Sequence, residues 1–328
     1  MTFHILITDY AWPSLEIERE ILADLPGELV VSETGEEADL VRLAPRVDAI
    51  LTCWKRVSAA VIEAAPRCRH IARYGIGLDN IDVARATALG IPVTNVPTYC
   101  VEEVSDHALA LIYALTRRVV RFDRAVRSGS YPGVPFAGIP RIAGLKLGVI
   151  GYGHIGRVLA RKARALGMAI LVHDPLVPSL PPEEGRALSL EALLAEADVI
   201  SVHAPLLPAT RHLISDAAIA RMKPGAYLVN TARGGIVDPD AVLRGLESER
   251  LAGAALDVYP EEPPDLGHPL FQHPRFIATP HTAFYSESSV RDLQTTAARQ
   301  VRAVLRGERP PHIVNPDFAR NSPRVRFG

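Results

Sequence analysis

Polar residues that can do chemistry follow three apolar runs in the second half of the chain. Arg233 follows "AYLVNTA", Asp257 follows "AAL" with Glu262 shortly beyond it, and His281 follows "FIATP". If these runs are parallel strands of one open sheet, their carboxyl ends share the edge at which such sheets bind ligands. The four side chains are therefore expected to lie near one another.

The residue types indicate a particular kind of reaction. A histidine near neutral pH can donate a proton, and an adjacent carboxylate favours its imidazolium form and orients the ring. An arginine fork can hold a carboxylate through two hydrogen bonds and polarise a neighbouring carbonyl. Arg233, Glu262 and His281 together suit the reduction of a ketone that stands beside a carboxylate, with His281 as the proton donor.

Two alternatives stay open on the residues alone. Glu261 competes with Glu262 for the place beside the histidine, and Arg233 could instead form a buried ion pair with Glu262. In "NTARGG" the two glycines after the arginine, Gly234 and Gly235, are expected to permit a sharp turn.

A phosphate-binding loop is predicted upstream of these residues. The stretch "LGVIGYGHIG" places Gly151, Gly153 and Gly156 in GxGxxG spacing after an apolar run and at the start of a helical pattern. Helix N–H groups would bind the pyrophosphate, and Asp174, at the end of the next apolar run, would bond the ribose hydroxyls. Because Asp174 would repel a 2′-phosphate, NAD is expected rather than NADP, unless a basic residue distant in sequence reaches the site.

Short apolar runs alternate with helical patterns over two stretches, residues 1–98 and 145–281, which indicates two parallel sheets covered by helices. Between them, apolar residues at helical spacing predict one long helix over residues 101–120. The Gly/Pro-rich passage 127–144 is too irregular for a helix or a central strand. A last helix is predicted over residues 286–307, without an evident packing partner.

Bulk properties exclude several classes of protein. The length of 328 residues favours two domains, and a net charge of -1 gives no general attraction to nucleic acid or anionic membranes. Cys53, Cys68 and Cys100 form no CxxC motif, and no histidine has a metal-binding spacing. No run approaches the roughly 18 apolar residues of a membrane span. A cytoplasmic enzyme without metal, nucleic-acid or membrane partners is expected.

Several motifs make the sequence similar to a known family. "RYGIGLDNIDV", "NVPTYCVEEVSDHALAL", "GVIGYGHIG", "NTARGGIVD", "LDVYPEEP" and "TPHTAFYSE" occur in family order over nearly the whole chain. They resemble the D-isomer-specific 2-hydroxyacid dehydrogenases, and most closely the C-terminal-binding-protein-like branch. The resemblance implies an NAD-dependent oxidoreductase of small 2-keto and 2-hydroxy acids. It makes Arg233 the substrate-binding arginine, Glu262 the partner of the acid/base residue His281, and Asp257 a partner of the nicotinamide carboxamide.

The resemblance also implies an α/β architecture of two doubly wound parallel-sheet domains. A Rossmann dinucleotide domain, residues 99–284, would be inserted into a flavodoxin-like substrate domain formed by residues 1–98 and 285–328. The two crossings, near Thr98 and Tyr285, would act as a hinge. Residues 101–144 look like the family's homodimer contact, through the nucleotide domain.

The expected contacts can be stated residue by residue. Those to the dinucleotide are Gly151, Gly153, His154, Ile155, Gly156, Asp174, Ala204, Pro205, Thr231, Ala232, Arg233, Asp257 and His281. Those to the substrate are Tyr74, Gly75, Ile76, Gly77, Arg233, Tyr99 and Phe284, with the loop 74–77 offering backbone N–H groups to the substrate carboxylate. Trp54 and Tyr285 add to an aromatic pocket, but the sequence does not identify the keto acid.

One hypothesis from another class remains. The chain could be an NADH-sensing, corepressor-like scaffold that binds a peptide and has little or no turnover. The complete set of Arg233, Glu262 and His281 favours the enzyme, because a scaffold needs no proton donor.

Overall fold

A computed structural model describes residues 2–131, 138–321 and 323–328. The chain divides into two compact units. The outer unit consists of Met1–Tyr99 and Ser286–Gly328, and the inserted unit is Cys100–Tyr285. Each crossing between the units falls one residue later than the boundary expected from the sequence.

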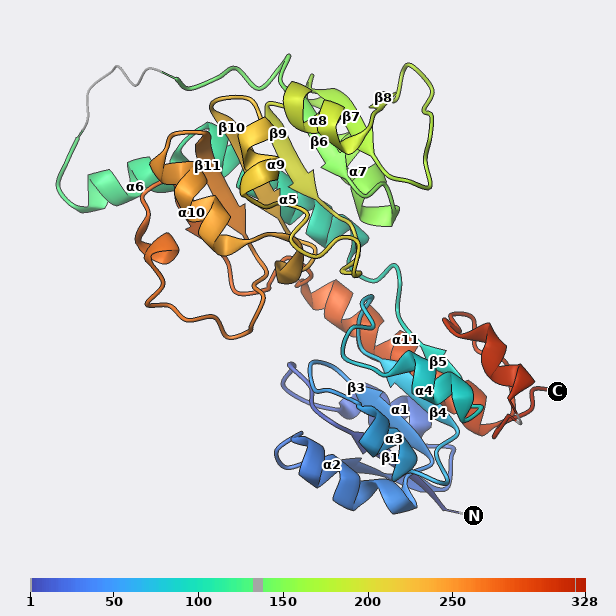
Figure 1. Ribbon diagram of the computed structural model, residues 1–328. Helices are drawn as coiled ribbons and strands as arrows, with labels where there is room; N and C mark the ends of the chain where they lie inside the picture. Colours follow the sequence, from blue (N-terminus) through green and yellow to red (C-terminus); the bar gives the residue numbers. More distant parts are fainter. Residues whose placement is uncertain (1, 132–137, 322) are drawn as a thin grey trace. The chain divides into compact units, whose positions relative to one another are not determined.

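The outer unit contains a parallel sheet of five strands in the order β2-β1-β3-β4-β5 (Figure 1). The strands are β1 (Phe3–Ile7), β2 (Gly27–Val31), β3 (Ala49–Thr52), β4 (His70–Arg73) and β5 (Val93–Thr94). In the central strands Leu6 pairs with Ile50, and Ile50 pairs with Ile71. These side chains are buried because helices cover both faces of a parallel sheet, which explains the nearly continuous apolar runs in the sequence.

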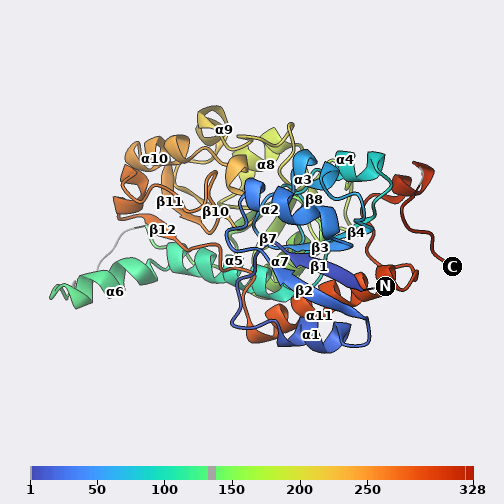
Figure 2. The same cartoon turned by 90° about the horizontal axis from the view of Figure 1, so that it is seen from below.

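In the part of the outer unit that the structure describes, five helices cover the sheet. They are α1 (Glu16–Leu22), α2 (Glu37–Leu43), α3 (Ala59–Glu63), α4 (Val83–Ala88) and α11 (Glu287–Leu305), with the short 3-10 turns η1 (Ala44–Arg46) and η4 (Pro316–Arg320). Helices α1 and α11 pack on one face and α2, α3 and α4 on the other (Figure 2). The partner of the last helix, which the pattern did not indicate, is therefore α1 together with β4.

The inserted unit contains a parallel sheet of seven strands in the order β12-β11-β10-β9-β6-β7-β8. The strands are β6 (Lys146–Ile150), β7 (Ala169–His173), β8 (Arg186–Ala187), β9 (Val199–Val202), β10 (Ala226–Asn230), β11 (Leu251–Leu256) and β12 (Phe276–Ala278). This order reverses direction between β6 and β9. A doubly wound sheet binds its ligand beyond the carboxyl ends of the strands at such a point.

The described residues of the inserted unit form six helices. They are α5 (Val101–Thr116), α6 (Val119–Arg127), α7 (His154–Ala165), α8 (Leu190–Glu196), α9 (Asp216–Arg221) and α10 (Pro239–Glu247), with the 3-10 turns η2 (Gly234–Ile236) and η3 (Pro269–Gln272). Helices α5 and α7 pack on one face, and α8, α9 and α10 pack on the other (Figure 2). The sheet therefore has a separate apolar core on each side.

The long helix predicted over residues 101–120 is wrong, because the structure has two helices there. Helix α5 ends at Thr116, Arg118 adopts a left-handed backbone with φ of 54°, and α6 begins at Val119. Helix α5 buries a stripe that includes Ala108 and Leu111, whereas α6 has no buried residue. Packing therefore gives α6 no reason to continue along the axis of α5. Residues 132–137 of the Gly/Pro-rich passage lie outside the described residues.

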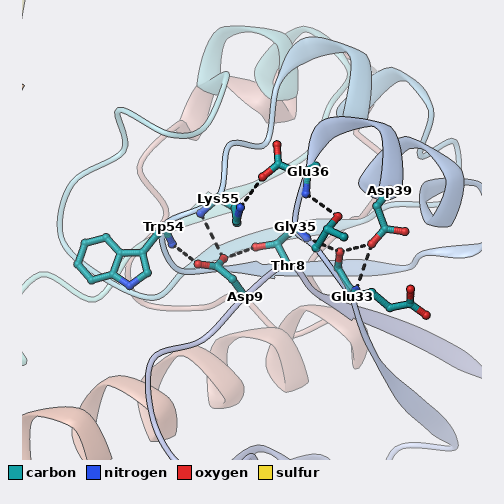
Figure 3. Close-up of polar contacts among 10 residues, drawn as sticks. Thr8, Asp9, Glu33, Gly35, Glu36, Asp39, Trp54 and Lys55 are labelled. Atoms are coloured by element: carbon teal, nitrogen blue, oxygen red, sulfur yellow. Dashed lines mark hydrogen bonds and ion pairs between the residues drawn. The ribbon is translucent and has the colours of Figure 1, made fainter. Parts of the chain in front are cut away.

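A carboxylate joins two strand-end loops of the outer unit (Figure 3). Asp9, which follows β1, accepts hydrogen bonds from the backbone N–H groups of Cys53, Trp54 and Lys55, at 3.0, 2.7 and 3.3 Å. The Thr8 hydroxyl donates to the same carboxylate at 2.6 Å. These bonds hold the loop after β3 and leave the Trp54 residue 42% exposed.

No helix within the described ranges is long and apolar enough to cross a membrane. The described residues also contain no group of three or more His, Cys, Asp or Glu side chains that could hold a metal ion. All three cysteines are buried free thiols, and burial raises the pKa of Cys53 and of Cys68 to about 12.

Candidate active site

The glycine loop lies between β6 and α7, and each of its glycines has a different structural role. Gly151 has a φ of 92°, and a Cβ there would lie 2.6 Å from the Ala204 nitrogen. A Cβ on Gly156 would lie 2.2 Å from the Gly151 carbonyl oxygen. Gly153 differs, because a Cβ there would meet no atom within 4 Å. Open space therefore faces the start of the 12-residue helix α7, where backbone N–H groups attract a phosphate.

Asp174 is held in place at the end of β7 by two backbone donors. Its Oδ2 accepts the Tyr152 N–H at 2.7 Å and its Oδ1 accepts the Leu176 N–H at 2.9 Å. The first bond joins Asp174 to the glycine loop, so the carboxylate and the phosphate site keep a defined relative position. The side chain is half-buried and keeps part of its acceptor capacity for a ligand hydroxyl.

The remaining residues expected to contact the dinucleotide follow strands β9 and β10 or begin α7. Ala204 and Pro205 follow β9, Thr231 and Ala232 follow β10, and His154 and Ile155 form the first positions of α7. The Thr231 hydroxyl is buried and has no hydrogen-bond partner among the described residues. A buried hydroxyl of this kind is costly unless something bonds to it. The unpartnered hydroxyl and the open space at Gly153 both fit a bound dinucleotide.

Asn230 shapes the turn that carries Arg233. Its side chain donates to the Arg233 carbonyl at 2.9 Å and accepts the Ala232 N–H at 3.0 Å. The Arg233 guanidinium donates to the Ala232 carbonyl at 2.7 Å. Arg233 is half-buried, and its charge helps to lower the pKa of Glu262.

The two glycines after the arginine serve close packing, and the sharp-turn explanation for them is corrected. Neither Gly234 nor Gly235 has a positive φ. A Cβ on Gly234 would lie 1.9 Å from the Tyr259 carbonyl carbon, and a Cβ on Gly235 would lie 3.0 Å from the Leu206 side chain. Glycine is needed at 234 because the backbone of the neighbouring loop leaves no room for a side chain.

His281 and Glu262 form a close pair. The Nδ1 atom of His281 lies 2.6 Å from Oε2 of Glu262, while Oε1 of Glu262 accepts the Tyr259 N–H at 3.0 Å. Burial alone would raise the pKa of Glu262. The hydrogen bond and charge of His281, the Tyr259 N–H and the charge of Arg233 more than offset this and lower it. Glu262 is therefore ionised at neutral pH, and its carboxylate holds the Nδ1 edge of the His281 ring.

Asp257 is completely buried at the end of β11 and holds the loop that carries His281. Its Oδ1 accepts the Thr279 hydroxyl at 2.5 Å and the Thr282 N–H at 3.0 Å, and its Oδ2 accepts the Ala283 N–H at 2.9 Å. The expected role toward the nicotinamide carboxamide stays a prediction. The carboxylate already serves as an anchor for residues 279–283.

Phe284 follows directly in the same loop. Its ring lies edge-on to the His281 ring, with 6.2 Å between their centroids, and Tyr285 packs edge-on against Phe284 at 6.4 Å. Phe284 therefore adjoins the histidine within the inserted unit, and Tyr285 adjoins Phe284.

In the outer unit the structure corrects the expected role of Tyr74. Its ring is 1% exposed, its hydroxyl donates to Glu18 at 2.9 Å, and its N–H donates to the Thr52 carbonyl at 2.8 Å. Neither its ring nor its N–H can therefore contact a substrate. In contrast, the described residues form no hydrogen bond to the N–H groups of the next three residues, 75–77. Tyr99 is half-buried beside the apolar core of this unit.

Several residues that shape the site were not found from the sequence. Asn230, Tyr259, Thr279 and His107 all contact the loops that carry Arg233, Glu262 or His281. Only Asn230 had a local signal, since asparagine commonly bonds to the backbone two residues onward in a turn. The other contacts join residues that are distant in sequence or use the backbone.

A doubly wound sheet with a glycine loop at the reversal of strand order, together with a His/Glu pair, defines a nicotinamide-dependent oxidoreductase domain. The family model "D-isomer specific 2-hydroxyacid dehydrogenase, NAD binding domain" matches residues 109–283. A glyoxylate reductase of Thermofilum pendens is 35% identical over 297 residues, which cover 87% of this chain and 86% of the relative. The chain therefore belongs to the D-isomer specific 2-hydroxyacid dehydrogenase family.

Two further relatives extend the comparison. A D-3-phosphoglycerate dehydrogenase of Mycobacterium tuberculosis is 39% identical over 285 residues, covering 86% of this chain and 54% of the relative. The chain thus spans about half the length of such phosphoglycerate dehydrogenases. A crystal structure of D-lactate dehydrogenase from Aquifex aeolicus, complexed with NAD and lactic acid, has a TM-score of 0.85 and 28% identity, covering 93% and 96% of the two chains.

These comparisons correct the finer assignment made from the sequence. The relatives are named glyoxylate reductase and phosphoglycerate dehydrogenase rather than members of the C-terminal-binding-protein-like branch. The assignment to the family is confirmed, and so is the expected architecture of a Rossmann-like NAD domain inserted into a substrate domain.

Proposed function

We propose that the protein is an NAD-dependent reductase of small 2-keto acids, which it converts to D-2-hydroxy acids. The observation that carries the proposal is the contact of 2.6 Å between His281 Nδ1 and Glu262 Oε2, within the positive field of Arg233. Glyoxylate is the first substrate to test, because glyoxylate reductases are among the relatives that match most of both chains.

Arg233, His281 and Glu262 each have a separate role in the proposed reaction. When bound, the reduced dinucleotide supplies the hydride that adds to the carbonyl carbon. The Arg233 fork binds the substrate carboxylate and polarises its carbonyl. His281 donates the proton of its Nε2 to the oxygen as it becomes an alkoxide, while Glu262 holds Nδ1 and stabilises the imidazolium. The products are the hydroxy acid and the oxidised dinucleotide.

The loop after β4 is a second candidate for the substrate carboxylate. Three consecutive N–H groups, those of Gly75, Ile76 and Gly77, have no hydrogen-bond partner among the described residues. Successive N–H groups of this kind form a concave anion site in many proteins. We assign them to the carboxylate, with Tyr99 and Phe284 contributing to the surface around the rest of the substrate.

The remaining assignments follow from the same proposal. The glycine loop, Thr231 and Asp174 hold NAD, and the charge of Asp174 disfavours NADP. The outer unit serves as substrate domain and the inserted unit as dinucleotide domain, with the two crossings as a hinge. Homodimer formation through the inserted unit and a cytoplasmic location stay predictions.

The test is NADH oxidation with a panel of glyoxylate, hydroxypyruvate, pyruvate and longer apolar keto acids. We expect turnover with at least one of them, and a D-configured product from every keto acid whose reduction creates a stereocentre. His281→Asn should lower turnover by roughly 100-fold or more while NADH still binds, because a general acid contributes 10² to 10⁴. Asparagine suits this position because it tolerates the positive φ of residue 281. Tight NADH binding without turnover on any keto acid would refute the proposal.

A further inference from the structure

The loop that carries His281 has a backbone conformation that needs support. His281 has a φ of 54°, in the left-handed region that is unfavourable for a residue with a side chain. Asp257 supplies the support through three successive N–H groups. Its carbonyl accepts the His281 N–H at 2.8 Å, and its carboxylate accepts those of Thr282 and Ala283.

Two further side chains complete the surroundings of this carboxylate. Thr279 Oγ1 donates to Asp257 Oδ1 at 2.5 Å. His107, from helix α5, has its Nε2 3.1 Å from Thr279 Oγ1 and 3.6 Å from Asp257 Oδ1. Because the threonine hydroxyl has one proton and donates it to Asp257, the His107 Nε2 must be the donor to Thr279. The bonds thus run in one direction, from His107 through Thr279 to Asp257.

Asp257 and Glu262 hold His281 in complementary ways. Asp257 fixes the backbone of the histidine, and Glu262 fixes one edge of its ring. Asp257 is completely buried, so removing one of its donors leaves a carboxylate oxygen short of a hydrogen bond. Neighbouring donors must then move to replace that bond. The groups that can move are the N–H donors of residues 281–283, and their displacement would carry the ring of His281 away from its working position.

We infer that Thr279 and His107 are positioning residues for His281 and act through Asp257. This inference rests on the proposed function of His281 as the proton donor. Neither residue contacts the reacting atoms. Their contribution is to keep the Asp257 carboxylate saturated with donors, so that it maintains the left-handed turn at His281.

The experiment compares isosteric and conservative variants of both residues in the full-length protein. Thr279→Val removes the hydroxyl and Thr279→Ser keeps it, while His107→Leu removes the donor and His107→Gln keeps one. Thr116→Val is the matched control, because Thr116 is also buried in this unit. Among the described residues its hydroxyl bonds only within helix α5, to the Ile112 and Tyr113 carbonyls. Keto-acid kcat, the NADH dissociation constant and the unfolding midpoint are measured for each.

We expect Thr279→Val and His107→Leu each to lower kcat by about tenfold or more, since misplacing a reacting group by an ångström can cost 10²-fold. The dissociation constant of NADH should change less than threefold. Thr279→Ser and His107→Gln should restore most of the activity, and the double variant Thr279→Val/His107→Leu should be no worse than Thr279→Val alone, because the two residues act in series.

Three results would overturn the inference. They are an unchanged kcat in Thr279→Val, a loss of NADH affinity in proportion to kcat, or a similar loss of kcat in Thr116→Val. A readout that does not need turnover separates this failure from failure of the proposed function. The Nδ1 proton resonance of His281, assigned by its absence in His281→Asn, should shift or broaden in Thr279→Val and stay unchanged in Thr116→Val. If it does not respond to Thr279→Val, the inference is wrong even where the enzyme is active.

Discussion

Glu262 uses both of its carboxylate oxygens within one short loop, one on the Tyr259 N–H at 3.0 Å and the other on the Nδ1 atom of His281 at 2.6 Å. The pKa of this carboxyl group is lowered although its partial burial opposes ionisation. Glu262 is therefore a carboxylate across the neutral pH range. Its negative charge favours the protonated form of the adjacent His281 ring, which is the form that a proton donor in the reduction of a ketone requires.

Glu262→Gln should move the high-pH limit of reduction to lower pH. The glutamine can keep the bond to Tyr259, but it loses the negative charge and turns an amide donor toward His281 Nδ1, which disfavours the imidazolium. The pH dependence of kcat/KM in the direction of reduction is the measurement. Glu261→Gln is the matched control, because Glu261 is the exposed neighbour, and it should leave the profile unchanged. A superimposable profile for Glu262→Gln would contradict the role of that carboxylate.

Arg233→Lys should lower keto-acid turnover sharply, although it keeps a positive charge at position 233. The planar fork that binds a carboxylate through two hydrogen bonds is lost, and we expect kcat/KM to fall by about 10²-fold. NADH affinity and the unfolding midpoint should change little. Arg244→Lys is the control, because that exposed fork binds Asp216 at 2.9 and 2.6 Å. Near-normal turnover in Arg233→Lys would mean that the substrate carboxylate is held elsewhere.

Gly153→Ala tests whether the dinucleotide occupies the open space at the start of α7. A Cβ there meets no atom of the described residues within 4 Å, and the φ of -76° suits alanine, so folding should be undisturbed. We expect NADH affinity to fall by about tenfold or more, as measured by fluorescence titration, because the methyl group would take the place of the pyrophosphate. If affinity is unchanged, the pyrophosphate binds elsewhere.

Gly234→Ala provides the opposite case. Its Cβ would lie 1.9 Å from the Tyr259 carbonyl carbon, so backbone must move, and we expect a fall in the free energy of unfolding of about 3 kcal/mol or more. The measurement is denaturant unfolding at neutral pH, with Gly153→Ala as the comparison. Equal unfolding midpoints for the two variants would contradict this, because the backbone at Tyr259 would then make room for the methyl group without a loss of stability.

His70 should make the outer unit sensitive to acid. It is completely buried, and burial lowers its pKa from 6.5 to about 3. Between these values the unfolded chain binds a proton that the folded chain does not, so stability is full above pH 6.5 and is lost as the pH falls toward 3. The loss over this window is on the order of a few kcal/mol.

Unfolding by denaturant at several pH values measures this loss. His70→Gln can keep a bond to Thr94, which His70 contacts at 2.9 Å, and should flatten the pH dependence in that window. The exposed His154→Gln should leave it unchanged. An equally steep dependence in His70→Gln would assign the acid sensitivity to other groups.

The sequence by itself determined those features whose cause is local. The GxGxxG spacing marks a turn at which backbone geometry requires glycine at 151 and 156, whereas the space at Gly153 is open to a ligand. The alternation of apolar runs with helical patterns predicts parallel sheets covered by helices. The same reasoning indicated that Arg233, Glu262 and His281 would gather, because parallel strands share one edge for their carboxyl ends.

Only the tertiary structure decided the features that depend on packing between distant segments. It placed Glu262 rather than Glu261 against His281, enclosed the ring of Tyr74 in the core, and ended α5 before Arg118. It also brought His107 of α5 to Asp257, the residue that follows β11, across 150 residues of chain. Such contacts depend on how helices and loops pack against a sheet, and no local pattern in the sequence contains that information.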